Sequence, residues 1–267
     1  MRIVNLASGS KGNSTFVAFG ETKILIDAGL TEKKLAETIF EIKENLANIQ
    51  GVLVTHEHID HIRAIKTLAK KYDMVFYVHK KLAESSVFKD IEFKEGKLFK
   101  FENTEFSVGD FEIKPFETSH DAVRPVGYVV KVFGSKAKAG FVTDLGVVSE
   151  TVKRELQGSK IVFIESNYDE TMLISGSYPK IVKDRIKGEF GHLSNVQSLE
   201  LAKFLFDTGT KCFVLSHISE NNNTPELALV NYIDYFESQG YVLDKDVFIR
   251  LSFQDKHGNN FIVKEDE

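Results

Sequence analysis

The sequence has a single cysteine, no tryptophan and no long apolar segment. Cys212 stands alone among 267 residues, which excludes an internal disulfide framework and any cysteine-rich zinc site. Because it lies in the apolar run 212–215, we expect a buried, unreactive thiol. No apolar stretch approaches the roughly 20 residues of a membrane span, and the N-terminus enters a strand-like run without the pattern of a signal peptide. We therefore expect a soluble, cytoplasmic protein that does not enter a membrane.

A strong charge of either sign is also missing. The formal net charge is −5 and the isoelectric point is near 6.0, which argues against a protein that grips nucleic acid through its overall field. Any polyanionic partner must then be held by a local basic patch or by metal ions. Proline- or glycine-rich linkers, repeats and low-complexity segments are absent as well. We therefore expect one domain that spans residues 1–267.

The rest of the sequence alternates strand and helix patterns. Short β-branched runs bounded by glycine, asparagine or charge predict strands at residues 17–19, 23–27, 51–55, 127–132 and 139–143. Gly109 and Asp110 predict a hairpin turn. Apolar residues at helical spacing predict helices over 60–72, 194–206 and 225–238. This order predicts an α/β fold in which two sheets pack face to face with helices outside, an αββα four-layer sandwich.

The densest chemical signal is the segment 55–61, which follows an apolar strand and opens a helix. It holds three histidines and one aspartate within six residues: His56, His58, Asp60 and His61. Neutral imidazole and carboxylate oxygen are ligands that suit Zn²⁺, Mn²⁺ or Fe²⁺. One four-coordinate ion would use only part of this set, so the pattern favours two metal ions over a solvated polar loop.

Three later residues also come just after apolar strands: His120, Asp144 and His217. Each one alone is a weak signal, because a single aspartate after a strand is usually a turn residue or a helix cap. A sheet presents the side chains at its strand ends along a shared edge. Their common position therefore indicates that all three join the histidine cluster.

This order of residues resembles the metallo-β-lactamase superfamily over nearly the whole chain, including the strand end at residues 26–29. The resemblance implies that one divalent metal is held by His56, His58 and His120. It implies that a second metal is held by Asp60, His61 and His217. Asp144 would bridge the two, a hydroxide between the metals would be the nucleophile, and Asp60 would also orient it.

Five longer segments resemble one group within that superfamily, the group called YycJ, WalJ or VicX: residues 7–14, 118–122, 165–167, 191–195 and 216–226. Members of the group are associated with a cell-wall two-component regulatory operon and are proposed to be DNA exonucleases. Asp144 stands where one class of true β-lactamases has cysteine. The resemblance thus implies nuclease rather than lactamase activity.

His192 remains once both metals have their ligands. In phosphodiesterases of this superfamily, a histidine in a similar motif lies near the scissile phosphate as a general acid or phosphate clamp, and the same resemblance makes Glu165 its orienting partner. Alternatively, His192 only belongs to the loop that opens the next helix. Lys180, Lys183 and Lys187 would share one helical face; this face is a candidate contact for a nucleic-acid backbone, although such faces are more often merely solvated.

The loop 8–14 offers a second possible phosphate contact. Gly9 and Gly12 would expose backbone amides, with Ser10 and Asn13 as side-chain partners. The same loop could equally be the hairpin that joins the first two strands. Because the sequence has no tryptophan and no obvious group of aromatic residues, we do not expect sequence-specific readout of nucleic acid.

We predict a phosphodiesterase that depends on two divalent metal ions, with nucleic acid as its substrate and DNA favoured by the resemblance. Two alternatives remain open. One is a small-molecule hydrolase of the same fold, acting on a cyclic phosphodiester, a thioester or a lactone. The other is a metal-stabilised regulatory protein of cell-wall signalling. His192 with Glu165 favours phosphate over carbonyl chemistry by analogy, and a complete ligand set argues against a pure scaffold.

Overall fold

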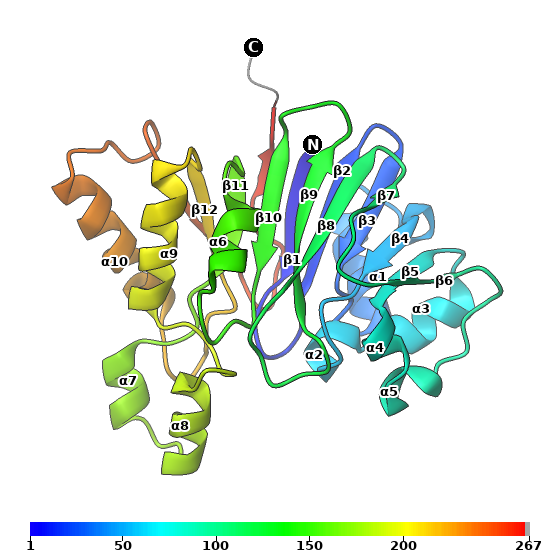
Figure 1. The fold of residues 1–267 in the computed structure, drawn as a ribbon, viewed down its shortest axis with the longest axis horizontal. Helices are drawn as coiled ribbons and strands as arrows, with labels where there is room; N and C mark the ends of the chain where they lie inside the picture. Colours follow the sequence, from blue (N-terminus) through cyan, green and yellow to red (C-terminus); the bar gives the residue numbers. More distant parts are fainter. Residues whose placement is uncertain (265–267) are drawn as a thin grey trace.

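The computed structural model describes residues 1–264, and the strands of this range form two seven-stranded sheets that lie face to face (Figure 1). The first sheet has the order β14-β1-β2-β3-β4-β5-β6. Its strands are β1 (Arg2–Ala7), β2 (Ser14–Phe19), β3 (Thr22–Ile26), β4 (Gly51–Leu53), β5 (Val75–His79), β6 (Leu98–Phe101) and β14 (Asn260–Ile262). The second has the order β13-β12-β11-β10-β9-β8-β7. Its strands are β7 (Phe106–Val108), β8 (Phe111–Glu117), β9 (Val126–Val132), β10 (Lys138–Val142), β11 (Ile161–Glu165), β12 (Cys212–Ser216) and β13 (Phe248–Leu251).

Helices flank both sheets. On the side of the first sheet lie α1 (Glu32–Glu41), η1 (Leu46–Asn48), α2 (Ile59–Ile62), α3 (Ile65–Lys71), α4 (Lys80–Ala83) and α5 (Ser86–Lys89). On the side of the second lie α6 (Glu150–Leu156), α9 (Asn195–Asp207) and α10 (Pro225–Ser238). Two more, α7 (Glu170–Ser175) and α8 (Lys180–Lys187), project beyond the strand ends at the lower left of Figure 1. The expected αββα four-layer sandwich is confirmed.

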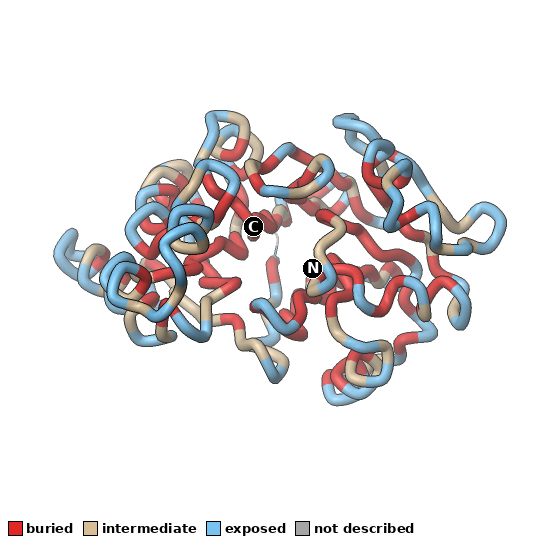
Figure 2. Tube along the Cα trace, turned by 90° about the horizontal axis from the view of Figure 1, so that it is seen from below, coloured by how far each residue is buried: buried red, intermediate tan, exposed pale blue. Residues whose placement is uncertain are grey.

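Alternation along the strands explains why the sandwich has three apolar layers. In β3, Leu25 packs toward α1, whereas its neighbours Ile24 and Ile26 pack between the two sheets. Successive side chains of a strand point to opposite faces, so one strand serves two cores at once. The second sheet behaves in the same way: Phe163 faces the first sheet and Ile164 faces the outer helices. Buried chain accordingly runs through the interior, with exposed chain on the periphery (Figure 2).

The predicted helix over 60–72 is divided in the structure. It consists of α2 and α3, which are separated at Arg63 and Ala64. In a continuous helix the Ala64 N–H would donate to the Asp60 carbonyl. Instead, Ala64 N donates to Ala28 O at 2.9 Å, and Asp60 O accepts from Asn13 N at 2.7 Å. Contacts with two loops distant in sequence therefore interrupt a locally helical pattern.

Other local predictions agree in part, since β4 ends at Leu53 rather than at residue 55 and Cys212 is less buried than expected. Ser194 and Thr224 cap α9 and α10, and Gly109 occupies the β7–β8 turn with a φ of 53°. Cys212 is partly buried, and burial raises the pKa of its thiol to about 12, so the thiol stays protonated as an unreactive cysteine should. In the described part of the chain, every helix is too short or too polar to cross a lipid bilayer.

The backbone of Asp60 lies very close to Gly29, so we expect replacement of Gly29 to destabilise the fold. A Cβ built on Gly29 would lie 1.6 Å from the backbone oxygen of Asp60. We expect Gly29→Ala to lower the free energy of unfolding by at least about 2 kcal/mol, because the backbone around Asp60 must move. Chemical denaturation measures this change. Gly258→Ala is the matched control, since its new Cβ would meet nothing closer than 3.7 Å; equal stability of the two variants would contradict the prediction.

Candidate metal centre

Six strand ends meet at one edge of the sandwich. In the first sheet β3 and β4 are parallel neighbours, and in the second β10, β11 and β12 are parallel. β8 runs in the direction of β10, because both pair antiparallel with β9. Polar side chains gather at this edge. Glu165 is the last residue of β11, and the others belong to the segments that follow the strands: Asp27, His56, His58, Asp60, His61, His120, Asp144 and His217.

The structure brings the candidate ligands together in two groups of three. Potential donor atoms of His56, His58 and His120 lie within 4.8 Å of one another, as do those of a second group, Asp60, His61 and His217. The imidazole rings are crowded, with the ring centroids of His56 and His61 only 4.1 Å apart. These two groups are the two ligand sets implied by the resemblance.

Asp144 lies between the two groups. It forms a third possible donor group with His56 and His61, one histidine from each set. Its Oδ2 is 3.2 Å from His61 Nε2, and its Oδ1 is 3.6 Å from His120 Nε2 and 3.4 Å from His217 Nδ1. A carboxylate in this position would be available to both donor groups.

Three residues of the edge have left-handed backbone conformations. The φ angles of Asp27, Asp144 and His217 are 60°, 57° and 55°. Such conformations cost of order 1–3 kcal/mol each in residues other than glycine, and they are concentrated at functional sites. The sharp bend at each strand end turns the next side chain into the shared edge, so the strain serves the convergence of the ligands.

The donor set fits divalent metal ions. Within residues 1–264, Nε2 of His56 is buried and has no hydrogen-bond partner, a costly state for a polar atom. Burial, with His61 nearby, holds the pKa of His56 well below its usual range, and burial also lowers the pKa of His120. Both imidazoles are therefore neutral and able to donate a lone pair, as a metal ligand must.

Asp27 orients the imidazole of His61. Its Oδ2 lies 2.7 Å from His61 Nδ1, and it also accepts hydrogen bonds from the backbone N and Oγ1 of Thr55, at 2.8 and 2.7 Å. This bond occupies Nδ1 and leaves Nε2 directed at Asp60 and Asp144. Carboxylate–histidine pairs of this kind fix the tautomer and ring orientation of metal-binding histidines.

Glu165 performs a similar task for two histidines. Its Oε1 lies 2.9 Å from His192 Nδ1 and 2.8 Å from His217 Nδ1, and its Oε2 accepts from the backbone N of Leu145 and Leu193. Burial alone would raise the pKa of this carboxyl, but the neighbouring His192 and His217 outweigh burial and lower the pKa to about 2. Glu165 therefore stays ionised and accepts a hydrogen bond from each of the two rings.

The carboxylates of Asp144 and Glu165 set the pKa of His217. Burial opposes protonation of this imidazole, but Asp144 and Glu165 raise its pKa to about 9. A neutral histidine here would leave the carboxylates without a compensating positive charge. The centre therefore favours a cation at this position, whether a proton or a metal ion.

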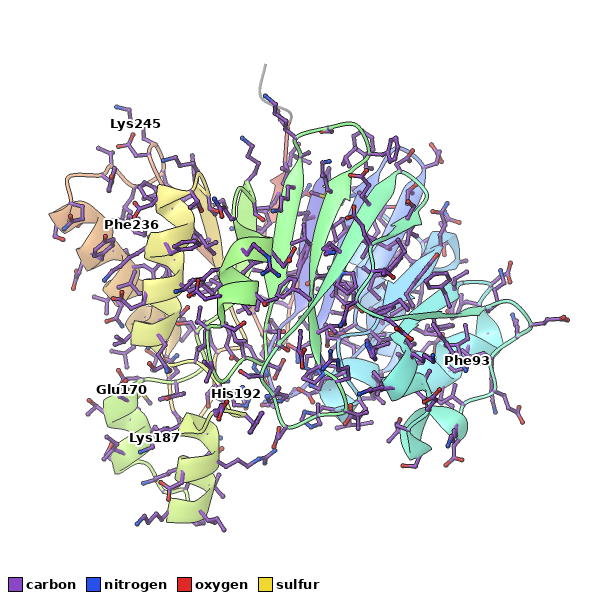
Figure 3. All side chains as sticks on the ribbon, viewed as in Figure 1. Phe93, Glu170, Lys187, His192, Phe236 and Lys245 are labelled. Carbon is purple, nitrogen blue, oxygen red and sulfur yellow. The ribbon has the colours of Figure 1, made fainter. Side chains whose placement is uncertain are left out.

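A cavity of about 310 Å³ opens onto the candidate ligands. Figure 3 shows His192 between the strand ends and α8, and its ring lines this cavity. Arg185 of α8 also lines it, and its Nε donates to Asp121 Oδ2 at 2.6 Å. Arg185, Ile186 and Gly191 thus form part of the cavity wall, and Arg185 brings a guanidinium to it.

The structure separates the two possible roles of the loop after β1. It joins β1 to β2 as a hairpin, and the Gly9 and Gly12 amides are used inside the loop, donating to Asn13 Oδ1 and Gly9 O. These two amides therefore have partners within the loop, and the hairpin is the alternative that the structure favours. Asn13 is buried, with Nδ2 3.1 Å from Asp60 Oδ2, whereas Ser10 is exposed and lines the cavity.

The three candidate lysines lie on α8 but not in the cavity lining. Lys183 donates to the backbone oxygen of Ile174 at 2.7 Å, and Lys180 and Lys187 are exposed. Arg185, which the sequence did not single out, is the basic residue of α8 that reaches the cavity. No local pattern distinguishes it from its neighbours, because its position depends on how α8 packs against the 120s loop.

The fold and the donor set together are those of a metal-dependent hydrolase. The described chain matches the β-lactamase superfamily domain over residues 22–218. It is 36% identical to Exodeoxyribonuclease YycJ of Bacillus anthracis over 239 residues, which cover 88% of this chain and 89% of the relative. It is 34% identical to Exodeoxyribonuclease WalJ of Streptococcus pneumoniae over 233 residues, 86% of either chain. This protein therefore belongs to the metallo-β-lactamase superfamily and, within it, to the YycJ/WalJ family of enzymes.

Solved structures support the fold at lower sequence identity. The metallo-β-lactamase fold protein YhfI of Bacillus subtilis superimposes with a TM-score of 0.74 at 14% identity, covering 97% of this chain and 98% of that one. The short form of human tRNase Z gives 0.66 at 13% identity, covering 99% and 100%. These likenesses extend along both chains, so the sandwich is shared as a whole.

The Asp27–His61 contact can be tested by an isosteric change. Asp27→Asn keeps the shape but removes the carboxylate that fixes His61, and we expect metal affinity to fall roughly 10–100-fold. Titration with a fluorescent zinc indicator as competitor measures the affinity. Asp110→Asn is the control. Asp110 lies in the β7–β8 turn, and its carboxylate accepts a hydrogen bond from Thr22 of β3 rather than from a candidate ligand. If both variants bind metal as tightly as the wild type, Asp27 has no part in positioning His61.

Proposed function

We propose that this protein is a dinuclear metal-dependent phosphodiesterase that acts as an exodeoxyribonuclease. The observation that carries the proposal is the position of Asp144 between two groups of three donors. The names of the YycJ and WalJ relatives support a DNA substrate and removal of nucleotides from an end. Zn²⁺ and Mn²⁺, or Fe²⁺, suit the imidazole and carboxylate donors.

Two metal ions at this edge would be held by His56, His58 and His120 on one side and by Asp60, His61 and His217 on the other, with Asp144 common to both. When bound, such a pair polarises a phosphoryl group and supplies an activated water at neutral pH. Asp27 and Glu165 keep the Nε2 atoms of His61 and His217 available, because each occupies the Nδ1 of its histidine.

His192 is the candidate proton donor. Its Nδ1 is bound to the ionised Glu165, so Nε2 is the nitrogen left for a substrate in the cavity. A protonated His192 can give its Nε2 proton to the oxygen that leaves phosphorus. The Glu165 carboxylate stabilises the imidazolium before this transfer. Arg185 lines the cavity, and its side chain is largely exposed although it pairs with Asp121. Its guanidinium can therefore contact a neighbouring phosphate.

Metal content and nuclease activity test the proposal together. Purified protein should contain close to two divalent ions per chain and should release nucleotides from end-labelled DNA with Mn²⁺ or Zn²⁺. Asp144→Ala should lower metal content and reduce the cleavage rate by more than roughly 100-fold, because even residues that merely support a ligand contribute 10–100-fold. Elemental analysis and gel assays measure both quantities.

Asp73→Ala is the matched control, because Asp73 is an exposed aspartate paired with Lys97; it should keep full metal and activity. One ion or none after reconstitution would contradict the dinuclear centre. Rapid thioester or lactone hydrolysis without DNA cleavage would favour the small-molecule alternative.

The role of His192 can be separated from that of the ligands. His192→Ala should retain metal and fold but lose roughly 10²–10⁴-fold in rate on DNA, if His192 protonates the leaving oxygen. A nitrophenyl phosphodiester has a good leaving group that needs little protonation, so its hydrolysis should be much less affected. Steady-state rates on the two substrates give the comparison. Equal losses would identify His192 as a phosphate clamp, and loss of metal would make it a ligand.

A further inference from the structure

Four exposed apolar side chains stand on the segments that carry the candidate site. Ile59 lies between His58 and Asp60, and Phe190 is two residues before His192. Val123 and Val147 each follow a candidate ligand by three residues. Their exposed fractions are 63% for Ile59, 58% for Phe190, 40% for Val123 and 42% for Val147. We call these four residues the apolar rim.

Hydrogen bonds between loops hold the rim together. Val123 N donates to the Glu57 carboxylate at 2.8 and 3.1 Å, which joins the loop of Val123 to that of Ile59. Val147 N donates to Ser119 Oγ at 2.8 Å. Phe190 O accepts from Asp121 N at 3.1 Å. The backbones of three rim residues are thus fixed to neighbouring loops of the same site, and their side chains are left facing solvent.

Single exposed apolar residues are normal on protein surfaces and need no explanation. Four of them on the loops that also supply the lining of one polar cavity are a different arrangement, because clustered apolar groups within a polar surround mark interaction sites. A molecule that covers these four residues therefore lies beside the cavity that the same loops line. The substrate of the proposed function is the molecule that enters this cavity, so it is the occupant that we assign to the rim.

We propose that the apolar rim contacts the unpaired bases on either side of the scissile phosphate. This inference rests on the proposed nuclease function and specifies how the nucleic acid is held. A nucleic-acid strand has an anionic phosphate at its backbone and flat apolar base faces beside it, which matches a polar cavity with apolar margins. Phe190 is the aromatic member of the rim and provides a stacking surface.

Two properties of the substrate follow from this contact. Apolar side chains bind the faces of all four bases and do not read hydrogen-bonding edges, so binding is tolerant of sequence. Base faces inside a duplex are already stacked on one another. The terminal nucleotides must therefore separate from their partners before the rim can hold them, and a frayed or single-stranded end is preferred to a closed one.

Removal of the bases tests the proposal directly. Two oligonucleotides of one length are compared, one with normal bases and one whose terminal three nucleotides carry abasic sites. Wild-type kcat/KM should favour the base-bearing strand by roughly tenfold or more, since stacking of a base on protein is worth that much. Phe190→Ala should reduce this preference to about threefold or less, with KM changing more than kcat, and Phe190→Tyr should restore it.

Phe133→Ala is the matched control. Phe133 is also an exposed phenylalanine, at 70%, but it lies in the turn after β9, at the opposite end of that strand from the cavity. It should leave the preference unchanged. The wild-type comparison itself needs no variant, and Val147→Ala gives a second test should Phe190→Ala fold poorly; Val147→Ala keeps the backbone bond to Ser119 and should also reduce the preference.

The outcomes separate the inference from the proposed function. If wild-type protein cleaves both strands equally, or if Phe190→Ala keeps the full preference, the rim does not bind bases, although the nuclease function stands. If the rim instead serves a protein partner, base removal has no effect, which also overturns the proposal. If no strand is cleaved with either metal, the proposed function itself fails.

Discussion

Asp144 is almost completely enclosed by protein, and four histidine nitrogens lie within 4.0 Å of its carboxylate. An ionised carboxylate in such a position is strongly unfavourable unless it is compensated. Burial alone would raise its pKa, but His217 and His61 hold it well below the usual range. The surrounding structure has to supply these imidazoles at fixed positions, and much of its architecture can be understood as meeting that requirement.

Two further buried carboxylates hold the histidines that surround Asp144. Asp27 fixes His61, and Glu165 fixes both His192 and His217. Each is anchored in turn by backbone N–H groups, those of Thr55 and of Leu145 and Leu193. The rigid strand ends therefore set the directions of the rings, while the loops beyond them are free to form the cavity wall and its apolar rim. This separation of scaffold and contact surface is usual for enzymes built on sheets.

Much of the architecture was accessible from the sequence, for identifiable reasons. The continuous apolar run Ile24-Leu25-Ile26 is typical of a strand buried on two faces, and Thr224 before Pro225 predicts the start of α10. Histidines and aspartates that follow apolar strands are expected to meet at one edge, because a sheet presents the side chains at its strand ends along that edge. Asp27 stands in the same kind of position as the ligands, directly after β3, and that signal could have predicted its part in the centre.

Residue types and their order along the chain thus determined the layers, the strand ends and the shared cluster of possible ligands, and the family resemblance implied its division into two sets. Tertiary structure alone decided the rest. The break between α2 and α3 arises from hydrogen bonds to Ala28 and Asn13, the sharing of Glu165 by two histidines joins residues 27 and 52 positions distant, and Arg185 reaches the cavity only through Asp121, 64 positions away. Local patterns report what a segment prefers by itself, whereas these contacts depend on which other segments are brought beside it when the sheets pack.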